Sequence, residues 1–169
     1  MTTQPRSPEQ RVKIPAAMLL SLLLGAGAGT VAQESPSVHE YRADGETTIE
    51  TVNGLRVITL RENVFVRQDD VELTGDMAVL EYNAANELQQ VQLTGGPASF
   101  EQAGDVDTEP LTGHSDTINY YAGAEATVEF IGTARFNQPG TTLACERIRY
   151  VIESGATTGQ ACSGSLTPQ

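Results

Sequence analysis

From residue 46 onward, apolar and polar residues alternate along the chain in short runs. Apolar pairs two residues apart include Val71 with Leu73, Val91 with Leu93, and Ile148 with Tyr150. This period is typical of strands that bury one face. Turn-forming segments separate the runs, among them VNG, QDD, TGGP, AGAE and QPG. Because no stretch after residue 32 has a helical period, the pattern predicts an all-β fold built from repeated short antiparallel strands.

One short phrase occurs three times. Its copies are NVFVRQ (63–68), PASFEQ (97–102) and TARFNQ (133–138). A second phrase follows each copy: LTGD (73–76), LTGH (111–114) and LACE (143–146). Cys145 thus stands where the earlier copies have Gly75 and Gly113. Another alternating strand comes next, and a unit this small cannot bury its own apolar face, so successive units must stack.

The residues leave two interpretations of the interior open. Many inward candidates are Ala, Val or Thr, and the chain has no tryptophan. A sandwich packed with modest side chains is the usual explanation of an apolar face. The alternative is a sheet curled around a groove that is filled by an apolar ligand.

The first 32 residues have the features of an export signal. Arg11 and Lys13 precede the apolar run IPAAMLLSLLLGAGAG (14–29), and small residues follow up to Ala32. We expect a signal peptide over 1–32 that is cleaved after Ala32. The alternative is a membrane anchor, although a spanning helix needs about 20 apolar residues. Residues 33–45 are expected to be a linker and 156–169 a C-terminal tail.

The chain is strongly acidic, with a net charge of −12. Three of its ten basic residues and one of its 22 acidic residues lie in 1–32, so the remainder has seven against 21 and a charge of −14. That remainder contains no lysine. A basic face for nucleic acid is therefore excluded, and adhesion to an anionic membrane is disfavoured.

Candidate catalytic and metal-binding residues are few. His114, Ser115 and Asp116 are adjacent, but neighbours on a strand point to opposite faces, so His114 and Ser115 cannot act as base and nucleophile. Two histidines and no Cys-x-x-Cys motif give no support for a metal site. We expect no enzyme, no metal and no cofactor.

Cys145 and Cys162 are the only cysteines. In an exported protein two cysteines most simply form one disulfide. Closing this short loop would stabilise the fold by about 3 kcal/mol. The alternative is a bridge between two chains.

A longer series of phrases resembles a known family. GGPASFEQ (95–102), TGHSDTINYY (112–121) and VEFIGTARFNQPGTTLACERIRY (128–150) follow ENVFVRQ (62–68) and LTGDMAVLEY (73–82). In this order they resemble the OstA-like family of lipopolysaccharide-transport proteins, in its LptA-type branch, over residues 46–155. The resemblance implies a twisted, partly open β-jellyroll in the periplasm. It also implies an apolar groove that holds the acyl chains of lipopolysaccharide, as part of a bridge from inner to outer membrane.

The resemblance assigns lipid contact to the inward apolar positions, with Phe100 as the strongest candidate. These positions are Ile58, Leu60, Val64, Val66, Ala98, Phe100, Ile118, Tyr120, Phe130, Ala134 and Phe136. The chain departs from the family pattern in its acidity. Since the ligand is itself anionic, this acidity weakens any picture in which basic residues capture the phosphates of the ligand. Alternatives are a membrane-anchored jellyroll of the same transport system and a standalone periplasmic lipid carrier.

The resemblance implies a head-to-tail homo-oligomer that also contacts an LptC-like jellyroll at the inner membrane and an LptD-like jellyroll at the outer membrane. A meandering repeat leaves unpaired backbone at strands near 46–52 and 147–152, and such edges can add a further strand. Contacts of this kind generate rods. The alternative is that Arg147, Arg149 and a disulfide-held tail cover the second edge and keep the protein monomeric.

Overall fold

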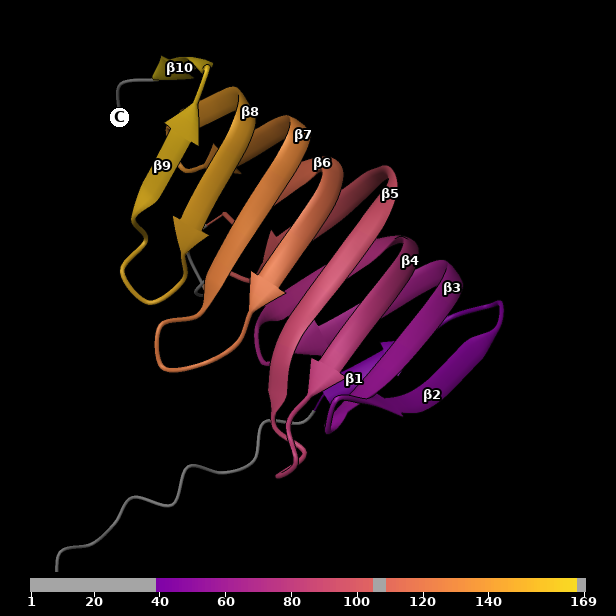
Figure 1. The fold of residues 1–169 in the computed structure, drawn as a ribbon. Coiled ribbons are helices and arrows are strands. Elements are labelled where there is room, and N and C mark those ends of the chain that lie inside the picture. The colour runs from indigo at the N-terminus through magenta and orange to yellow at the C-terminus, as the bar shows by residue number, and fades with distance from the viewer. Residues whose placement is uncertain (1–38, 105–108, 167–169) are drawn as a thin grey trace, which may run out of the picture. The chain divides into compact units, whose positions relative to one another are not determined.

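The computed structural model describes residues 39–104 and 109–166, which form one antiparallel sheet of ten strands (Figure 1). The strands are β1 (His39–Arg42), β2 (Thr47–Val52), β3 (Leu55–Gln68), β4 (Val71–Tyr82), β5 (Leu88–Gln102), β6 (Leu111–Tyr121), β7 (Thr127–Gln138), β8 (Thr141–Val151), β9 (Thr157–Gln160) and β10 (Ser163–Leu166). The predicted all-β class is confirmed. The expected signal peptide lies outside the described residues, and within them no helix is long and apolar enough to span a membrane.

Each long strand bends near its middle. The strand pairing shifts near the middle of every neighbouring pair from β3 to β8, for example between Arg61 and Val64 and between Ile131 and Ala134. The β4–β5 pair has a second shift between Glu81 and Tyr82. Such bulges let a strand turn sharply without ending. Their alignment forms a corner that folds the whole sheet in two (Figure 1).

The two halves of the folded sheet are called leaf 1 and leaf 2. Leaf 1 contains 64–68, 71–75, 98–102, 111–115, 134–138 and 141–145. Leaf 2 contains 55–61, 77–82, 88–94, 117–121, 127–131 and 147–151. The margins opposite the corner carry the turns between strands, and the opening between these margins is called the mouth.

The core lies between the leaves, because alternate residues of each half-strand face inward. On leaf 1, strand pairing aligns Val66, Leu73, Phe100, Gly113 and Phe136 in one row. On leaf 2 the matching row is Leu60, Ala78, Leu93, Ile118, Phe130 and Ile148. Apart from Gly113, these residues belong to a single buried apolar cluster that contains both leaves. The repeated phrases of the sequence thus correspond to the leaf 1 halves of β3, β5 and β7.

The register corrects one expected equivalence. Gly75 pairs with Val64 and Cys145 pairs with Ala134, and both lie beside the corner. Gly113 instead pairs with Phe100, one row farther from the corner, and Ser115 takes the corner position opposite Ala98. The LTGH phrase is therefore offset by two residues from LTGD and LACE. An offset of two keeps the same side chains inward, because the side-chain period of a strand is two.

The two ends of the sheet are built alike. At one end β1 pairs with the leaf 1 half of β3 and β2 pairs with its leaf 2 half. At the other end β10 and β9 pair with the leaf 1 and leaf 2 halves of β8. Figure 1 shows these short strands at opposite ends of the stack. The expectation that 147–152 forms the second edge is therefore wrong, because the C-terminal segment covers it.

The sheet also extends beyond the expected domain bounds of 46–155. Strand β1 lies inside the segment expected as a linker, and β9 and β10 lie inside the expected tail. Both segments lack the apolar alternation that marks the longer strands, since backbone pairing and not apolar burial places them. The disulfide between Cys145 and Cys162 joins β8 to the segment between β9 and β10, within one chain.

Candidate functional site

The apolar interior between the leaves is the candidate functional site. All eleven residues expected to contact lipid are buried, with at most 5% of any of them exposed. Strand pairing places Val66, Phe100 and Phe136 in the same inward row, as their equivalence in the repeat predicts. The structure thus brings the expected residues together on facing leaves.

Aromatic rings connect the two leaves. Phe100 and Phe136 of leaf 1 lie 5.6 Å and 5.5 Å from Phe130 of leaf 2, measured between ring centroids. Tyr150 of leaf 2 lies 5.0 Å from Phe136 and 6.2 Å from Phe100. These separations are those of favourable edge-on and tilted ring pairs. The C-terminal half of the interior is therefore closed by direct contact between leaves.

Gly113 provides the space that the ring of Phe130 fills. A Cβ atom at Gly113 would overlap Cε1 and lie 2.6 Å from Cζ of the Phe130 ring. The glycine needs no unusual backbone angle here. Its function is to let a leaf 2 ring reach the backbone of leaf 1.

The sequence prediction omitted a comparable number of interior residues. Those buried to the same degree are Val71, Leu73, Ala78, Leu80, Leu88, Val91, Leu93, Val128, Ile148 and Tyr150. The signal for most of them was the same spacing of two. The family resemblance selected positions chiefly from β3, β5 and β7, so the neighbouring strands β4 and β8 were not represented.

A chain of hydrogen bonds crosses the mouth. The Tyr150 hydroxyl on leaf 2 donates to Oε1 of Gln102 on leaf 1 at 2.9 Å. Nε2 of Gln102 donates to Oδ2 of Asp70 at 2.9 Å, in the turn between β3 and β4. Gln102 is the closing residue of one repeated phrase. This terminal Gln thus lies at the mouth, where its amide can bond both leaves.

The mouth is acidic as well as polar. Burial, followed by the carboxylates of Asp69, Glu153 and Asp70, raises the pKa of Tyr120 to about 12. Burial and then Asp70 and Glu153 also raise the pKa of Tyr150. Both hydroxyls stay protonated at neutral pH, so they offer donors at the margin of an apolar interior.

The leaves are in contact near the N-terminal end as well. A narrow space runs between Val66, Val71 and Leu73 of leaf 1 and Tyr82, Leu88, Val91 and Tyr120 of leaf 2. Its volume is about 10 Å³, which is room for roughly one water molecule. An acyl chain could enter only if the leaves moved apart.

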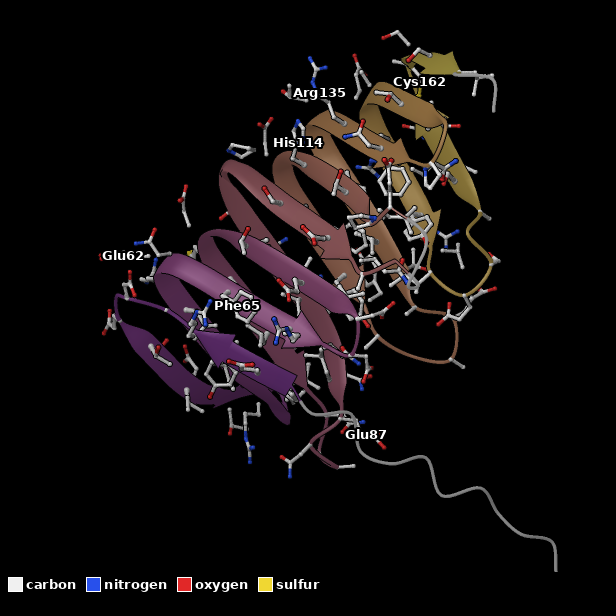
Figure 2. The ribbon with its side chains drawn as sticks, turned by 180° about the vertical axis from the view of Figure 1, so that it is seen from behind. Glu62, Phe65, Glu87, His114, Arg135 and Cys162 are labelled. Carbon is white, nitrogen blue, oxygen red and sulfur yellow. A yellow bond between two sulfur atoms is a disulfide. The ribbon has the colours of Figure 1, made fainter. Side chains whose placement is uncertain are left out.

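The outer surface carries a separate arrangement. Phe65 points outward from leaf 1 but is only 7% exposed, because guanidinium groups cover it. The Cζ atom of Arg42 lies 4.2 Å from the ring centroid and that of Arg67 lies 5.3 Å from it. Arg67 also pairs with Glu72 and, at 3.9 Å, with Glu40 of β1. Figure 2 shows Phe65 on this face of the sheet.

His114 and Ser115 do not converge, as the strand geometry predicted. Ser115 is 1% exposed, and its hydroxyl donates to the carbonyl oxygen of Thr117. His114 lies on the outer side of the same strand and lines a surface hollow with Glu72 and Glu101 (Figure 2). Among residues 39–104 and 109–166, no group of three or more His, Cys, Asp or Glu could hold a metal ion.

Comparisons with known proteins identify the fold and the family. The solved structure of LptH from Pseudomonas aeruginosa, described as the LptA-homologous periplasmic component of its lipopolysaccharide transport device, superimposes with a TM-score of 0.65. The two are 23% identical, and the match covers 78% of this chain and 96% of that one, which establishes the jellyroll fold.

Sequence comparison gives a consistent result. The lipopolysaccharide export system protein LptH of Pseudomonas aeruginosa is 29% identical over 108 residues, which are 61% of this chain and 61% of that protein. The match therefore spans less than two thirds of the relative. The model of the family described as LptA/(LptD N-terminal domain) LPS transport protein matches residues 37–156. The chain belongs to this family of lipopolysaccharide-transport proteins.

Proposed function

We propose that the protein is a periplasmic carrier that holds the acyl chains of lipopolysaccharide between leaf 1 and leaf 2. The observation that carries this proposal is the unbroken apolar interior, to which every long strand from β3 to β8 contributes. Membership of a family of lipopolysaccharide-transport proteins supports this choice of ligand. The hydrogen-bonded mouth is the margin at which the leaves part to admit it.

The physics of the interior suits such a cargo. Each methylene that moves from water into an apolar environment gains about 0.8 kcal/mol, so a lipid with several acyl chains cannot cross water unaided. The chains replace contacts that the leaves now make with each other, which limits the cost of opening. No covalent chemistry is required of the carrier.

Site-specific photo-crosslinking in cells tests the lipid contact. A photoreactive phenylalanine analogue at Phe100 or Phe136 should give an adduct that an antibody to lipopolysaccharide detects. Ser99 is the matched control, because it neighbours Phe100 and its side chain points to the outer face of the same strand. Adducts of equal yield from Ser99 and Phe100 would contradict the proposal.

Copies of the protein also join end to end, and the two sheet ends support this. Strands β3 to β8 alternate in direction, so β9 and β10 run opposite to β1 and β2. If the next copy continues the stack, β9 faces its β2 on leaf 2 and β10 faces its β1 on leaf 1. The new contact is then antiparallel in both leaves, like every contact within the sheet.

The side chains at the ends are compatible with this junction. Among the described residues, the exposed large apolar side chains are Tyr41, Ile49 and Val52 at the first end and Leu166 at the last. Extending the strand register places the small residues Gly164 and Thr157 in the rows of Tyr41 and Ile49. Large side chains of one copy would thus meet small ones of the next. LptC-like and LptD-like jellyrolls would dock at the two ends of the row.

Two variants with one blocked end each test the assembly. Ile49→Asp places a charge on the first end and Leu166→Asp on the last. Each contact uses one end of each kind, so each variant alone should be monomeric by light scattering. An equal mixture should form dimers and nothing larger, because only one pair of free ends remains.

Other outcomes separate the alternatives. A wild-type protein that stays monomeric at high concentration, but crosslinks to lipid from Phe100, would be a standalone carrier. Retention of residues 14–29 in the exported protein would indicate a membrane-anchored component of the same system. A mixture of the two variants that grows into long assemblies would contradict the end-to-end contact described above.

A further inference from the structure

We propose that the Cys145–Cys162 disulfide holds the C-terminal docking edge in place, so that only the oxidised chain can add another copy at β9 and β10. This inference rests on the end-to-end assembly proposed above. It assigns to the disulfide control of an interaction surface, whose partner is the β1–β2 end of a second copy.

Strands β9 and β10 have little to hold them except backbone pairing and the disulfide. Each has four residues, and both pair with β8 alone. Every residue of β10 is exposed, and its one large apolar side chain, Leu166, is 80% exposed. No ion pair or hydrogen bond between side chains joins the described part of 157–166 to the rest of the sheet. Short strands without an apolar face are marginally stable in water.

The disulfide acts where the backbone pairing is interrupted. The ladder with β8 runs from Tyr150 to Arg147 against β9 and resumes at Ala144 against β10. Cys145 lies in this gap on β8 and is 7% exposed. Cys162, which is labelled in Figure 2, lies between β9 and β10, where the chain passes from leaf 2 to leaf 1.

Gly159 shows how closely the segment is drawn onto the disulfide. A Cβ atom at Gly159 would overlap the sulfur of Cys162 and lie 2.8 Å from the sulfur of Cys145. The strand can pass over the bridge at this position because the residue is glycine. The bridge therefore supports β9 directly as well as tethering the chain that leads to β10.

Reduction would remove this support. A dithiol reductant attacks the sulfur of exposed Cys162, the bond between the two protein sulfurs breaks, and a mixed disulfide forms. The second thiol of the reductant then attacks this mixed disulfide and closes the disulfide of the reductant. Two electrons and two protons have passed from the reductant to Cys145 and Cys162, which are now thiols. With the tether gone, the entropy of the freed segment favours its release from β8.

The released state presents a different end. The edge becomes β8, whose inward residues Leu143, Ile148 and Tyr150 lose their lateral neighbour. Because β8 runs in the same direction as β1 and β2, the edge that could pair with them in antiparallel fashion is lost. A chain that has not yet been oxidised would therefore not join a row of copies. Oxidation after export would make the C-terminal end competent for docking.

Hydrogen exchange tests the release. The wild-type protein with and without dithiothreitol is compared with a Cys145→Ala/Cys162→Ala variant. We expect amides of 157–166 to exchange at least tenfold faster in the reduced and variant proteins, and amides of 88–102 in β5 to be unchanged. Ser163→Ala, which keeps the disulfide, is the matched control and should behave like the wild type. Equal protection of 157–166 with and without the disulfide overturns the proposal.

Light scattering tests the docking edge itself. The oxidised wild type should form assemblies that grow with concentration, and the double alanine variant should remain monomeric. Mixed with Ile49→Asp, whose first end is blocked but whose last end is free, the double variant should form dimers through its intact first end. Failure of that dimer to form shows that the substitutions harm more than the C-terminal edge and overturns the proposal.

The two proposals fail in different ways. If the oxidised wild type does not assemble, end-to-end assembly is wrong and this inference falls with it. If it assembles and the double variant assembles equally well, the docking edge is independent of the disulfide and this inference alone is wrong.

Discussion

At the scale of single residues, the interior depends on the large side chain of Phe130 packing against Gly113, which has no side chain. Phe130 is fully buried, and its ring occupies the place that a Cβ of Gly113 would take. Protein interiors are close-packed, so even one added methyl group must displace a neighbour. The position of the leaves relative to each other is thereby linked to a single glycine.

Gly113→Ala should therefore destabilise the protein. The backbone of leaf 1 or the Phe130 ring must move, and overpacking of this kind costs about 1–3 kcal/mol. Urea unfolding followed by fluorescence or circular dichroism measures the change. Gly96→Ala is the matched control, because no atom lies within 4 Å of a Cβ built there. Similar losses from both substitutions would show that Gly113 has no special packing function.

The tyrosines at the mouth predict loss of stability at alkaline pH. The pKa of Tyr120 rises from 10.0 to about 12 in the folded protein, chiefly through burial. The fold thus favours the protonated hydroxyl. This contribution is complete below pH 10, the value of the unfolded chain, and is lost as the pH rises through about 12.

Denaturation midpoints across this range test the effect. Tyr120→Phe keeps the ring and removes the ionisable group, so its stability should fall less between pH 10 and 12 than that of the wild type. Tyr121→Phe, whose side chain points to the other face of β6, is the control. A variant with an unaltered alkaline profile would be evidence against this function of Tyr120.

At the scale of elements, β1 is held by backbone pairing with β3 and by charged side chains, and not by apolar burial. Its Arg42 lies over the Phe65 ring, and its Glu40 pairs with Arg67, whose guanidinium also lies over that ring. The strand belongs to the end that we propose as a docking surface. The strength of this clamp therefore affects whether the first end is ready for a partner.

Arg42→Ala should loosen β1 without unfolding the sheet. Loss of an exposed cation–π contact costs about 0.5–1 kcal/mol, and amides of 39–42 should exchange correspondingly faster. Arg56→Ala, which removes an equal charge from β3, should leave exchange at 39–42 unchanged. If both substitutions accelerate exchange alike, the loss of charge and not the ring contact is responsible.

The elements also show how far sequence reasoning reached. The alternation of apolar residues predicted the inward face of each half-strand, because burial of one face imposes a period of two. It also predicted short strands separated by turns, which is wrong for TGGP (94–97), because this segment lies inside β5. The bend was not predicted, since it depends on residues such as Glu62 and Asn63 adopting positive φ angles of 66° and 48°, which their identities do not require. Strands β9 and β10 were missed because no apolar pattern marks them. The hydrogen bond between Tyr150 and Gln102 joins residues 48 apart, and only the fold brings them together.

At the scale of the whole molecule, charge is distributed unevenly. No arginine or lysine occurs between residues 68 and 134, whereas acidic residues occur throughout that stretch. The last sixteen residues, 154–169, carry no charged side chain. The C-terminal side of the proposed junction therefore supplies no charged side chain to an ion pair. Since each copy is acidic, two copies as a whole repel each other.

Salt should consequently promote assembly. The screening length falls from about 30 Å at 0.01 M to about 8 Å at 0.15 M salt, which weakens repulsion between copies without weakening any ion pair at the junction. The mean mass measured by light scattering should rise with salt at fixed protein concentration. A mass that falls with salt would indicate that attractive charge pairs hold the copies together.

The bend in every long strand has a consequence for the dimensions of the protein. Because each strand passes through both leaves, a pair of strands lengthens the two leaves equally and leaves the cross-section unchanged. Neighbouring strands are about 4.8 Å apart, so each repeat adds about 10 Å along the stack. The number of repeats thus sets the length of the sheet. A chain with one more or one fewer repeat would span a different distance with the same cross-section.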